Sequence, residues 1–296
     1  MATLHIIGNG FDLAHGLPTS YWHYYQFLKN NGEAWFVNMM ENYFGHTPSL
    51  NNHRRQYNIL WSDLERALGE YDVDGIFDFL HEGHEEDLDH MGQYVDAIDA
   101  ELKYHFVDIK QQFQETFADW CRSIDVTQAK RKRIPHFDPN GLFLTFNYSD
   151  ILERVYGIPD AHVLHIHGRS SKQYDELIVG HNTPAVLRRQ YEATFLDMPE
   201  IMSTIASTIN GLLKDQQGII LRHARFFQKL NRVDKVVVYG HSMAPVDLQY
   251  FKAVHNNVSP QARWHFSYYD YDECPKKKEI AHSLGIKLSA NPYFMI

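Results

Sequence analysis

The stretch LHIIGNGFDLAHGLP, residues 4–18, opens with a short apolar run and passes directly into a turn with two closely spaced glycines. A buried strand that ends in this way brings backbone N–H groups close to a phosphate, because a Cβ at either glycine would hold the ligand away. Gly8-Asn9-Gly10 lacks the third glycine of the usual dinucleotide fingerprint. The turn alone therefore also fits a tight strand-to-helix connection that binds nothing.

Five further apolar runs have the length and composition of strands, at residues 142–146, 162–166, 177–179, 236–239 and 263–268. Most of them are rich in β-branched or aromatic residues, and several end at a glycine, as strands of a buried parallel sheet do. We therefore expect an α/β fold. The expected fold contains a Rossmann-like parallel sheet whose strands come from distant segments of the chain. Residues 1–296 are expected to form a single domain.

Long helical segments interrupt the predicted sheet. A helix of about 30 residues is predicted from apolar residues three or four positions apart. Its stripe, which serves packing, consists of Tyr94, Ile98, Leu102, Phe106, Ile109, Phe113, Phe117 and Trp120. Shorter helices are expected around 22–28 and 61–68. We interpret residues 20–135 as a helical insertion over the ligand edge of the sheet, and residues 184–230 as a second one, interrupted near Pro199 and Gly218.

Composition excludes several classes of protein. The net charge of −9 argues against general nucleic-acid binding, and the basic runs at 130–133 and 276–278 are expected to be solvated faces. No run approaches the roughly 18 apolar residues of a membrane span, and the first residues lack a secretion signal. Two distant cysteines, Cys121 and Cys274, argue against a disulfide framework and a thiolate zinc site. We expect a cytoplasmic protein that binds neither membrane nor nucleic acid.

Polar side chains follow two of the predicted strands. Asn147 comes directly after residues 142–146, where α/β sheets bind ligands, although Asn147 or Ser149 could equally cap the next helix. In the next strand, alternation places His165 and His167 on one face, so the pair could hold a metal, with His181 as a candidate third ligand. A metal-dependent hydrolase is therefore one alternative function. His167, next to Gly168, could instead act as a base.

The turn Gly240-His241-Ser242-Met243-Ala244 follows the strand at 236–239 and resembles a serine nucleophile elbow, G-x-S-x-G. Ala244 replaces the final glycine, and only 54 residues follow Ser242, too few for the strands that usually carry the acid and the histidine. Asp270 and His282 could nominally fill those roles. The other interpretation is a second glycine turn, whose hydroxyl and N–H groups contact phosphate or ribose.

Four motifs together resemble the sirtuin family. Residues 8–18 resemble its opening, G-A-G-I-S followed by G-I-P-D-F-R, with the same spacing from the first glycine to the proline. Residues 145–149, TFNYS, resemble the sirtuin T-Q-N-I-D, and residues 166–168 resemble its L-H-G. Residues 240–242 resemble its late G-T/S-S turn. All four occur in the family's order.

Over nearly its full length the chain resembles the AbiH family of phage abortive-infection proteins. The shared motifs are GNGFDLAHGLP at 8–18, W-x-D-L-E at 61–65, F-N-Y at 146–148, H-I-H-G at 165–168 and G-H-S at 240–242. This resemblance implies an anti-phage effector that is latent until infection, because an unregulated one would kill its host. The insertion at 20–135 would supply a gate, or a surface for a phage-derived activator or a second copy.

The sirtuin-like pattern implies that NAD is the ligand. Carried over, Asn147 orders the nicotinamide ribose and a water, and His167 is a base at a ribose hydroxyl. Contacts to the diphosphate and ribose are expected from Gly8, Asn9, Gly10, Phe11, Asp12, Gly168, Gly240, His241 and Ser242.

The departures from the sirtuin pattern narrow the reaction. Thr19-Ser20-Tyr21 stand where a sirtuin has D-F-R, and the cysteine count excludes its zinc module, so protein deacylation is disfavoured. Asp12 replaces a small hydroxyl residue, and its carboxylate would repel a diphosphate unless it faces a ribose hydroxyl or caps the next helix. The expected function is hydrolysis of NAD, the substrate, to nicotinamide and ADP-ribose. The alternative is a sensor that binds NAD or ADP-ribose without turnover.

Overall fold

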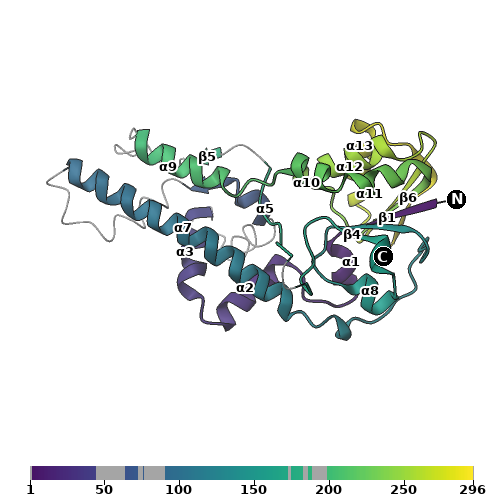
Figure 1. Cartoon of the computed structure of the whole chain (residues 1–296), viewed down its shortest axis with the longest axis horizontal. Coiled ribbons are helices and arrows are strands. Elements are labelled where there is room, and N and C mark those ends of the chain that lie inside the picture. The colour runs from purple at the N-terminus through teal and green to yellow at the C-terminus, as the bar shows by residue number, and fades with distance from the viewer. Residues whose placement is uncertain are drawn as a thin grey trace. The chain divides into compact units, whose positions relative to one another are not determined.

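The computed structural model describes residues 2–44, 64–72, 76, 91–172, 175–182, 186–188 and 199–295 (Figure 1). The chain divides into two compact units, each built from separate segments. The first unit comprises Met1–Ser20, Ala118–Ile178 and Asp215–Ile296, and the second comprises Tyr21–Phe117 and Val179–Lys214. None of the helices in the described part of the chain combines the length and the apolar composition that crossing a membrane requires.

The first unit contains a six-stranded sheet in the order β4-β3-β1-β6-β7-β8, and every neighbouring pair is parallel. The strands are β1 (Ala2–Ile7), β3 (Leu142–Thr145), β4 (Val163–His165), β6 (Val233–Tyr239), β7 (Arg263–Tyr268) and β8 (Leu288–Met295). Renumbered along the chain, this is the 3-2-1-4-5-6 order of dinucleotide-binding sheets. The predicted Rossmann-like parallel sheet is confirmed, and its order reverses between β1 and β6, where such sheets bind ligands.

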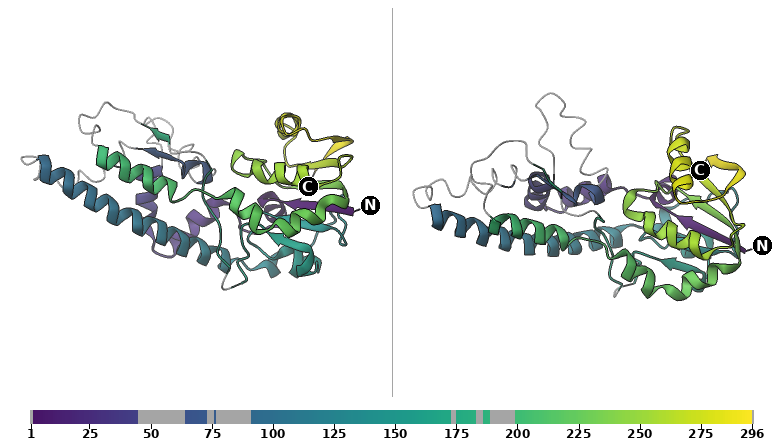
Figure 2. Two further views of the ribbon diagram at one scale, coloured as in Figure 1. Left: turned by 45° about the horizontal axis from the view of Figure 1, so that its top comes forward. Right: turned by 90° about the horizontal axis from the view of Figure 1, so that it is seen from above.

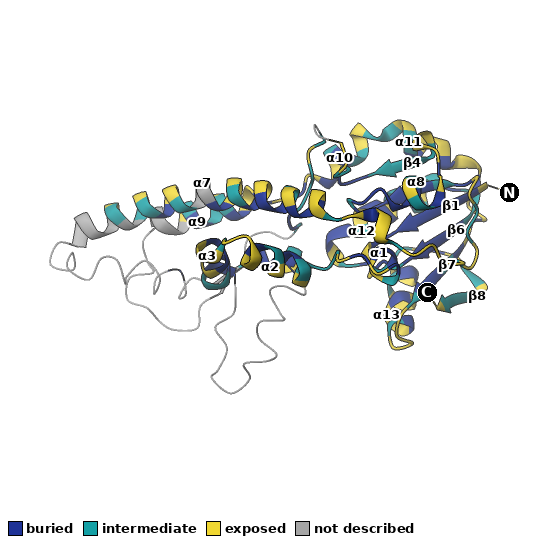
Figure 3. Ribbon diagram, turned by 90° about the horizontal axis from the view of Figure 1, so that it is seen from below, coloured by how far each residue is buried: buried dark blue, intermediate teal, exposed yellow. Residues whose placement is uncertain are grey.

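Helices cover both faces of this sheet. α1 (Asn9–Ala14) and α8 (Ile151–Tyr156) pack on one face, and α10 (Gln216–Arg222), α11 (Ala224–Lys229), α12 (Leu248–Asn257) and α13 (Glu273–Ser283) pack on the other. Alternate residues of β1 serve the two cores: Leu4 and Ile6 pack on the α12 side, and Ile7 packs on the α1 side. The inner strands β1, β3 and β6 are accordingly mostly buried between helices whose outer faces are exposed (Figure 3).

The second unit is mainly helical. Its helices are α2 (Tyr21–Asn30), α3 (Ala34–Phe44), α5 (Leu64–Ala67), α9 (Pro199–Asn210) and most of α7 (Met91–Ser123), and strands β2 (Glu70–Asp72) and β5 (Val186–Arg188) pair in parallel. α7 confirms the predicted long helix, and the stripe residues Leu102, Ile109, Phe113 and Phe117 are buried. The side chains at 94, 98 and 106, and the whole of Trp61, lie outside what the structure describes. α9 runs alongside α7 (Figure 2), where Thr204 Oγ1 donates to Asp99 Oδ1 at 2.8 Å.

The boundaries of the units differ from those of the predicted insertions. Residues 118–135 belong to the first unit, because Val126 and its neighbours pack into the core on the α1 side. Residues 215–230 also belong there, because α10 and α11 cover the other face. Pro199 is the first residue of α9, as suits a residue without an N–H in a first turn. Gly218 lies inside α10, where its N–H donates to the capping carboxylate of Asp215.

Two strand assignments change. Residues 177–179, predicted as a strand, form none, because Ile178 makes single contacts instead of a ladder: its N–H donates to the His167 carbonyl, and its carbonyl accepts from the Tyr148 hydroxyl. β8, at the edge of the sheet, was not predicted. It contains Asn291-Pro292, and its register against β7 shifts along its length. Proline is tolerated on an edge strand, where one side of the ladder needs no donor.

His5, in the middle of β1, should make the fold sensitive to acid. Its ring is fully buried and stacks on Phe143, and burial lowers the pKa of His5 from 6.5 to about 4. In the unfolded chain His5 is protonated below about pH 6.5, whereas in the folded chain it stays neutral down to about pH 4. The stability that neutral His5 contributes is thus complete above pH 6.5 and is lost as the pH falls towards 4, with about 2 kcal/mol gone at pH 5.

We therefore expect the free energy of unfolding to fall less between pH 7.5 and pH 5 in His5→Gln than in the wild type. Nε2 of His5 lies 3.1 Å from both the backbone N and O of Asp138, and a glutamine amide can bind either. Urea titrations at the two pH values measure the difference. His282→Gln, at an exposed histidine, is the matched control. An equal loss in all three proteins would show that His5 does not carry the acid sensitivity.

Candidate functional site

The two glycine turns meet at the point where the strand order reverses. Gly8 donates its N–H to the Tyr239 carbonyl at 2.8 Å, and Gly10 donates to the Gly240 carbonyl at 2.7 Å. A Cβ on Gly10 would lie 2.8 Å from Gly240 Cα, and a Cβ on Gly240 would lie 2.1 Å from the backbone N of Phe11. Gly240 also has φ +59°, a left-handed conformation that favours glycine. These glycines allow two backbones to touch.

The N–H groups at this edge divide into two sets. Those of Gly8, Gly10 and Gly240 have acceptors within the protein, the last being the Ser267 Oγ on β7 at 2.7 Å. Gly168 likewise donates to the His165 carbonyl at 3.3 Å. For the N–H groups of Asn9, His241 and Ser242, by contrast, no acceptor occurs in the described part of the chain. These three N–H groups are available to donate to an anion.

Asp12 is buried in α1 and binds residues that follow β3. Its Oδ1 accepts from Asn147 Nδ2 at 2.6 Å, and its Oδ2 accepts from Ser149 Oγ at 2.5 Å. Burial raises the pKa of Asp12 from 3.8 to about 6, against the lowering effect of these two donors and of His165. Asp12 does not cap α1, whose N-cap is Gly8 and has no side-chain cap. The expected helix-cap role is wrong.

Nearly every polar group of Asn147 is engaged. Its backbone N–H donates to Thr145 Oγ1 at 3.1 Å, and its carbonyl lies 3.2 Å from His165 Nδ1. Its Nδ2 donates to the Gly8 carbonyl at 3.1 Å as well as to Asp12. Only the side-chain Oδ1 has no partner among the described residues. Asn147 therefore joins the ends of β1 and β3 and leaves one hydrogen-bond acceptor for a ligand.

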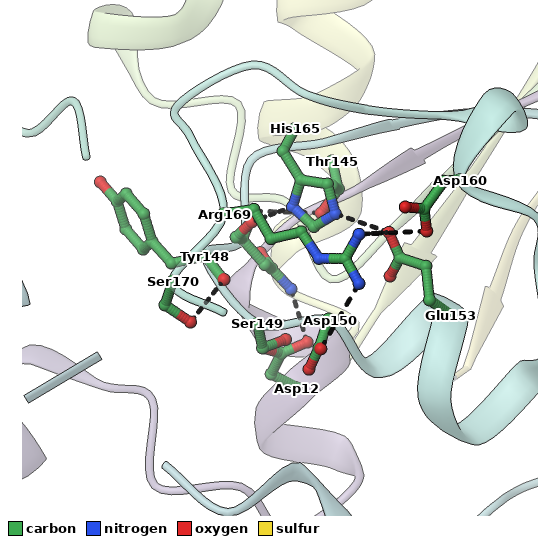
Figure 4. Close-up of polar contacts among 11 residues, drawn as sticks. Asp12, Thr145, Tyr148, Ser149, Asp150, Glu153, Asp160, His165, Arg169 and Ser170 are labelled. Carbon is green, nitrogen blue, oxygen red and sulfur yellow. Dashed lines mark hydrogen bonds and ion pairs between the residues drawn. The ribbon is translucent and has the colours of Figure 1, made fainter. Parts of the chain in front are cut away.

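A charged cluster surrounds His165 at the end of β4 (Figure 4), and His165 in turn contacts the Asn147 carbonyl. His165 Nε2 lies 2.9 Å from Glu153 Oε1, so protein oxygens already engage both ring nitrogens. The Arg169 guanidinium lies between the carboxylates of Asp150, Glu153 and Asp160, at 3.5, 3.4 and 3.1 Å. These ion pairs tie the loop after β4 to α8. The His165 ring consequently directs no lone pair at a metal.

His167 lies elsewhere than strand alternation predicts. β4 ends at His165, so His167 falls in the turn beyond it and does not share a strand face with His165. Its buried ring packs against aromatic rings, with centroids 5.4 Å from Phe146, 6.3 Å from Tyr148 and 5.6 Å from Tyr250. The rings of Phe146 and Tyr148 belong to the two neighbours of Asn147 in the chain. The structure thus places His167 against the segment that carries Asn147.

The metal interpretation receives no support from the described residues, which include no cluster of three or more His, Cys, Asp or Glu side chains suited to a metal ion. His181, the suggested third ligand, is buried in the second unit, where its Nε2 lies 2.8 Å from the Ile209 carbonyl. His165 and His167 do not share a face, for the reason given above.

The serine-hydrolase interpretation also lacks its partners. Ser242 is exposed, and within the described residues no hydrogen bond joins it to Asp270 or His282. Asp270 instead accepts from the N–H of Asp272 at 3.1 Å. The turn itself is fixed by His241, whose Nδ1 accepts from the N–H of Met243 at 2.9 Å.

Several residues of this site were not predicted. They are Ser149 as a partner of Asp12, Glu153 and Arg169 around His165, and Ser267 beneath Gly240. One signal was available for the first. Asp12 stands where the motif G-A-G-I-S has its serine, and Ser149 stands where T-Q-N-I-D has its aspartate. The two departures are complementary, and the structure brings them into contact.

Comparison with known proteins gave one result. A family model described as "Bacteriophage abortive infection AbiH" matches residues 4–268. This span includes most of β1, all of β3, β4, β6 and β7, and every residue of the site. No curated protein and no solved structure matches the chain.

Proposed function

The chain belongs to the AbiH family of bacteriophage abortive-infection proteins, and from this defence role we propose that it hydrolyses NAD to nicotinamide and ADP-ribose. One observation carries the proposal. At the carboxyl ends of β1 and β3, the backbone groups and the Nδ2 of Asn147 bind the protein, and its Oδ1, which has no partner among the described residues, is left for a ligand. The position, beside the reversal of strand order, is where sheets of this topology bind dinucleotides.

The reaction breaks the bond between ribose C1′ and nicotinamide and forms a bond from C1′ to a water oxygen. Departure of nicotinamide leaves an oxocarbenium-like ribose, and Asn147 Oδ1 accepts from the water and holds it where it attacks. His167 polarises a ribose hydroxyl. The N–H groups of Asn9, His241 and Ser242 donate to the diphosphate. The proton of the water leaves to solvent as ADP-ribose forms.

Purified protein incubated with NAD tests the proposal, alone and with extracts of phage-infected cells as a source of activator. We expect nicotinamide release in at least one of these conditions, and a decrease of about 100-fold or more in His167→Ala, since a positioned acid or base contributes 10²–10⁴-fold. His255→Ala, on α12 outside the site, is the matched control. No release in any condition, or undiminished release by His167→Ala, would contradict the proposal.

The three available N–H groups also support a second function, a sensor that binds NAD or ADP-ribose without turnover. Such a sensor would signal through the helical second unit, to a phage-derived partner or a second copy. ADP-ribose would then raise the melting temperature, because a ligand that binds only the folded state stabilises it. A raised melting temperature with no nicotinamide release in any condition would favour the sensor over the hydrolase.

A further inference from the structure

We propose that Asp12, paired with Ser149, is a positioning residue that locks the Asn147 amide with its oxygen turned towards the ligand. This rests on the proposed function, because the ligand is the NAD ribose or its attacking water. Asp12 touches no reacting atom and acts only through Asn147. Within the pair, Ser149 Oγ donates to Asp12 Oδ2, and the other carboxylate oxygen, Asp12 Oδ1, accepts from Asn147 Nδ2.

The lock follows from what surrounds the amide nitrogen. Asn147 Nδ2 faces two acceptors, Asp12 Oδ1 at 2.6 Å and the Gly8 carbonyl at 3.1 Å, and both of its hydrogens are used. Turning the amide over would bring its oxygen against those same two oxygens, with no proton between them. The flipped amide is therefore excluded. Oδ1 is then fixed as an acceptor, which is what holding a water or ribose hydroxyl requires.

The position of the carboxylate is costly for folding, and this favours a functional role. Asp12 is 1% exposed, and a buried carboxylate that ionises near neutral pH opposes folding unless its partners compensate. Burial and the nearby Asp150 raise the pKa of Asp12 to about 6, while Ser149, Asn147 and His165 lower it. At pH 7 the group is charged, so it accepts strongly from Asn147 at the expense of stability.

The complementary exchange of the two side chains supplies a direct test. Asp12→Ser removes the carboxylate, and the double variant Asp12→Ser/Ser149→Asp restores a carboxylate–hydroxyl pair with its members exchanged. We expect Asp12→Ser to lower kcat for nicotinamide release by about 10-fold to 100-fold, with KM changed less than about threefold. The double variant should recover to within about fivefold of the wild type. If the double variant is folded by circular dichroism but kcat does not recover, the proposal that the Asp12–Ser149 pair positions Asn147 is wrong.

Asp12→Asn is the conservative variant, and it separates positioning from a merely structural role. The asparagine can still accept from Asn147 through its oxygen and donate to Ser149 through its nitrogen. We expect kcat within about fivefold of the wild type and a higher melting temperature. We also expect the wild-type kcat to fall by no more than about fivefold as the pH drops below 6, because protonated Asp12 is neutral like asparagine, and this decrease to be absent in Asp12→Asn. If Asp12→Asn loses as much kcat as Asp12→Ser, the amide lock is wrong.

A measurement without catalysis distinguishes failure of this proposal from failure of the proposed function. In NMR spectra the side-chain amide of Asn147, assigned by its loss in Asn147→Ala, should shift with a midpoint near pH 6 in the wild type and not in Asp12→Asn. This holds even if the protein releases no nicotinamide, in which case only the hydrolase fails. If the chemical shift of the Asn147 side-chain amide in the wild type does not change between pH 5 and pH 7, the proposal is wrong.

Discussion

Gly240→Ala should lose at least about 2 kcal/mol of folding stability through the addition of a single methyl group. The new Cβ would lie 2.1 Å from the backbone N of Phe11, so the β1 and β6 turns must separate. Their separation breaks the hydrogen bond from Gly10 to the Gly240 carbonyl. Overpacking costs about 1–3 kcal/mol, and the left-handed φ of +59° adds about 1 kcal/mol or more.

Gly157→Ala separates these two contributions. Gly157 has φ +69°, and a Cβ on it would meet nothing within 4 Å, so the variant bears only the backbone cost of about 1 kcal/mol. Urea titrations of the wild type and both variants give the free energies of unfolding. Equal losses in the two variants would mean that the turns do not need to touch, and that the glycines serve backbone conformation alone.

Asn147→Ala should lower the rate of nicotinamide release by about 100-fold or more while the protein remains folded. The variant removes the Oδ1 acceptor that we propose holds the water, and loss of one preorganised hydrogen-bonding group at a reacting centre typically costs about 10²–10³-fold in kcat. It also leaves Asp12 Oδ1 without its donor, so we expect a lower melting temperature as well.

Asn9→Ala is the matched control for Asn147→Ala. Asn9 lies on the same edge, but its Nδ2 donates to the Thr19 carbonyl and its side chain is exposed. Its backbone N–H, which we propose as a diphosphate donor, survives the substitution. Release rates and melting temperatures of the three proteins decide the matter. A rate for Asn147→Ala within threefold of the Asn9→Ala rate would remove Asn147 from the mechanism.

The sheet was predictable because its signals are local. Short apolar runs, several of which end at a glycine, predicted β1, β3, β4, β6 and β7, and parallel strands of one sheet must end at one edge. In the structure Asn147, which follows β3, contacts Gly8 and Asp12, which follow β1. β8 was not predicted because Asn291-Pro292 interrupts the pattern, and packing against β7, which no local signal reports, is what makes this segment a strand.

The polar contacts of the site were less predictable. Asp12 and Ser149 are 137 positions apart, and their pairing depends on where α1 meets the loop after β3. The role of the glycines was predicted only in part. The sequence indicated that a Cβ would be excluded at Gly8 and Gly10, but in the structure the group that excludes it is the backbone of the other turn. His167 was misplaced on a strand face because β4 ends two residues earlier than alternation required.

The central claim, that this member of the AbiH family destroys NAD in infected cells, can be measured directly. Cells that carry the wild type or Asn147→Ala are infected with a phage against which the wild type protects, and NAD, nicotinamide and ADP-ribose are quantified before lysis. We predict a fall in NAD of at least about 10-fold, with matching ADP-ribose and nicotinamide, in the wild type alone. Protection by the wild type with an unchanged NAD level would contradict the account.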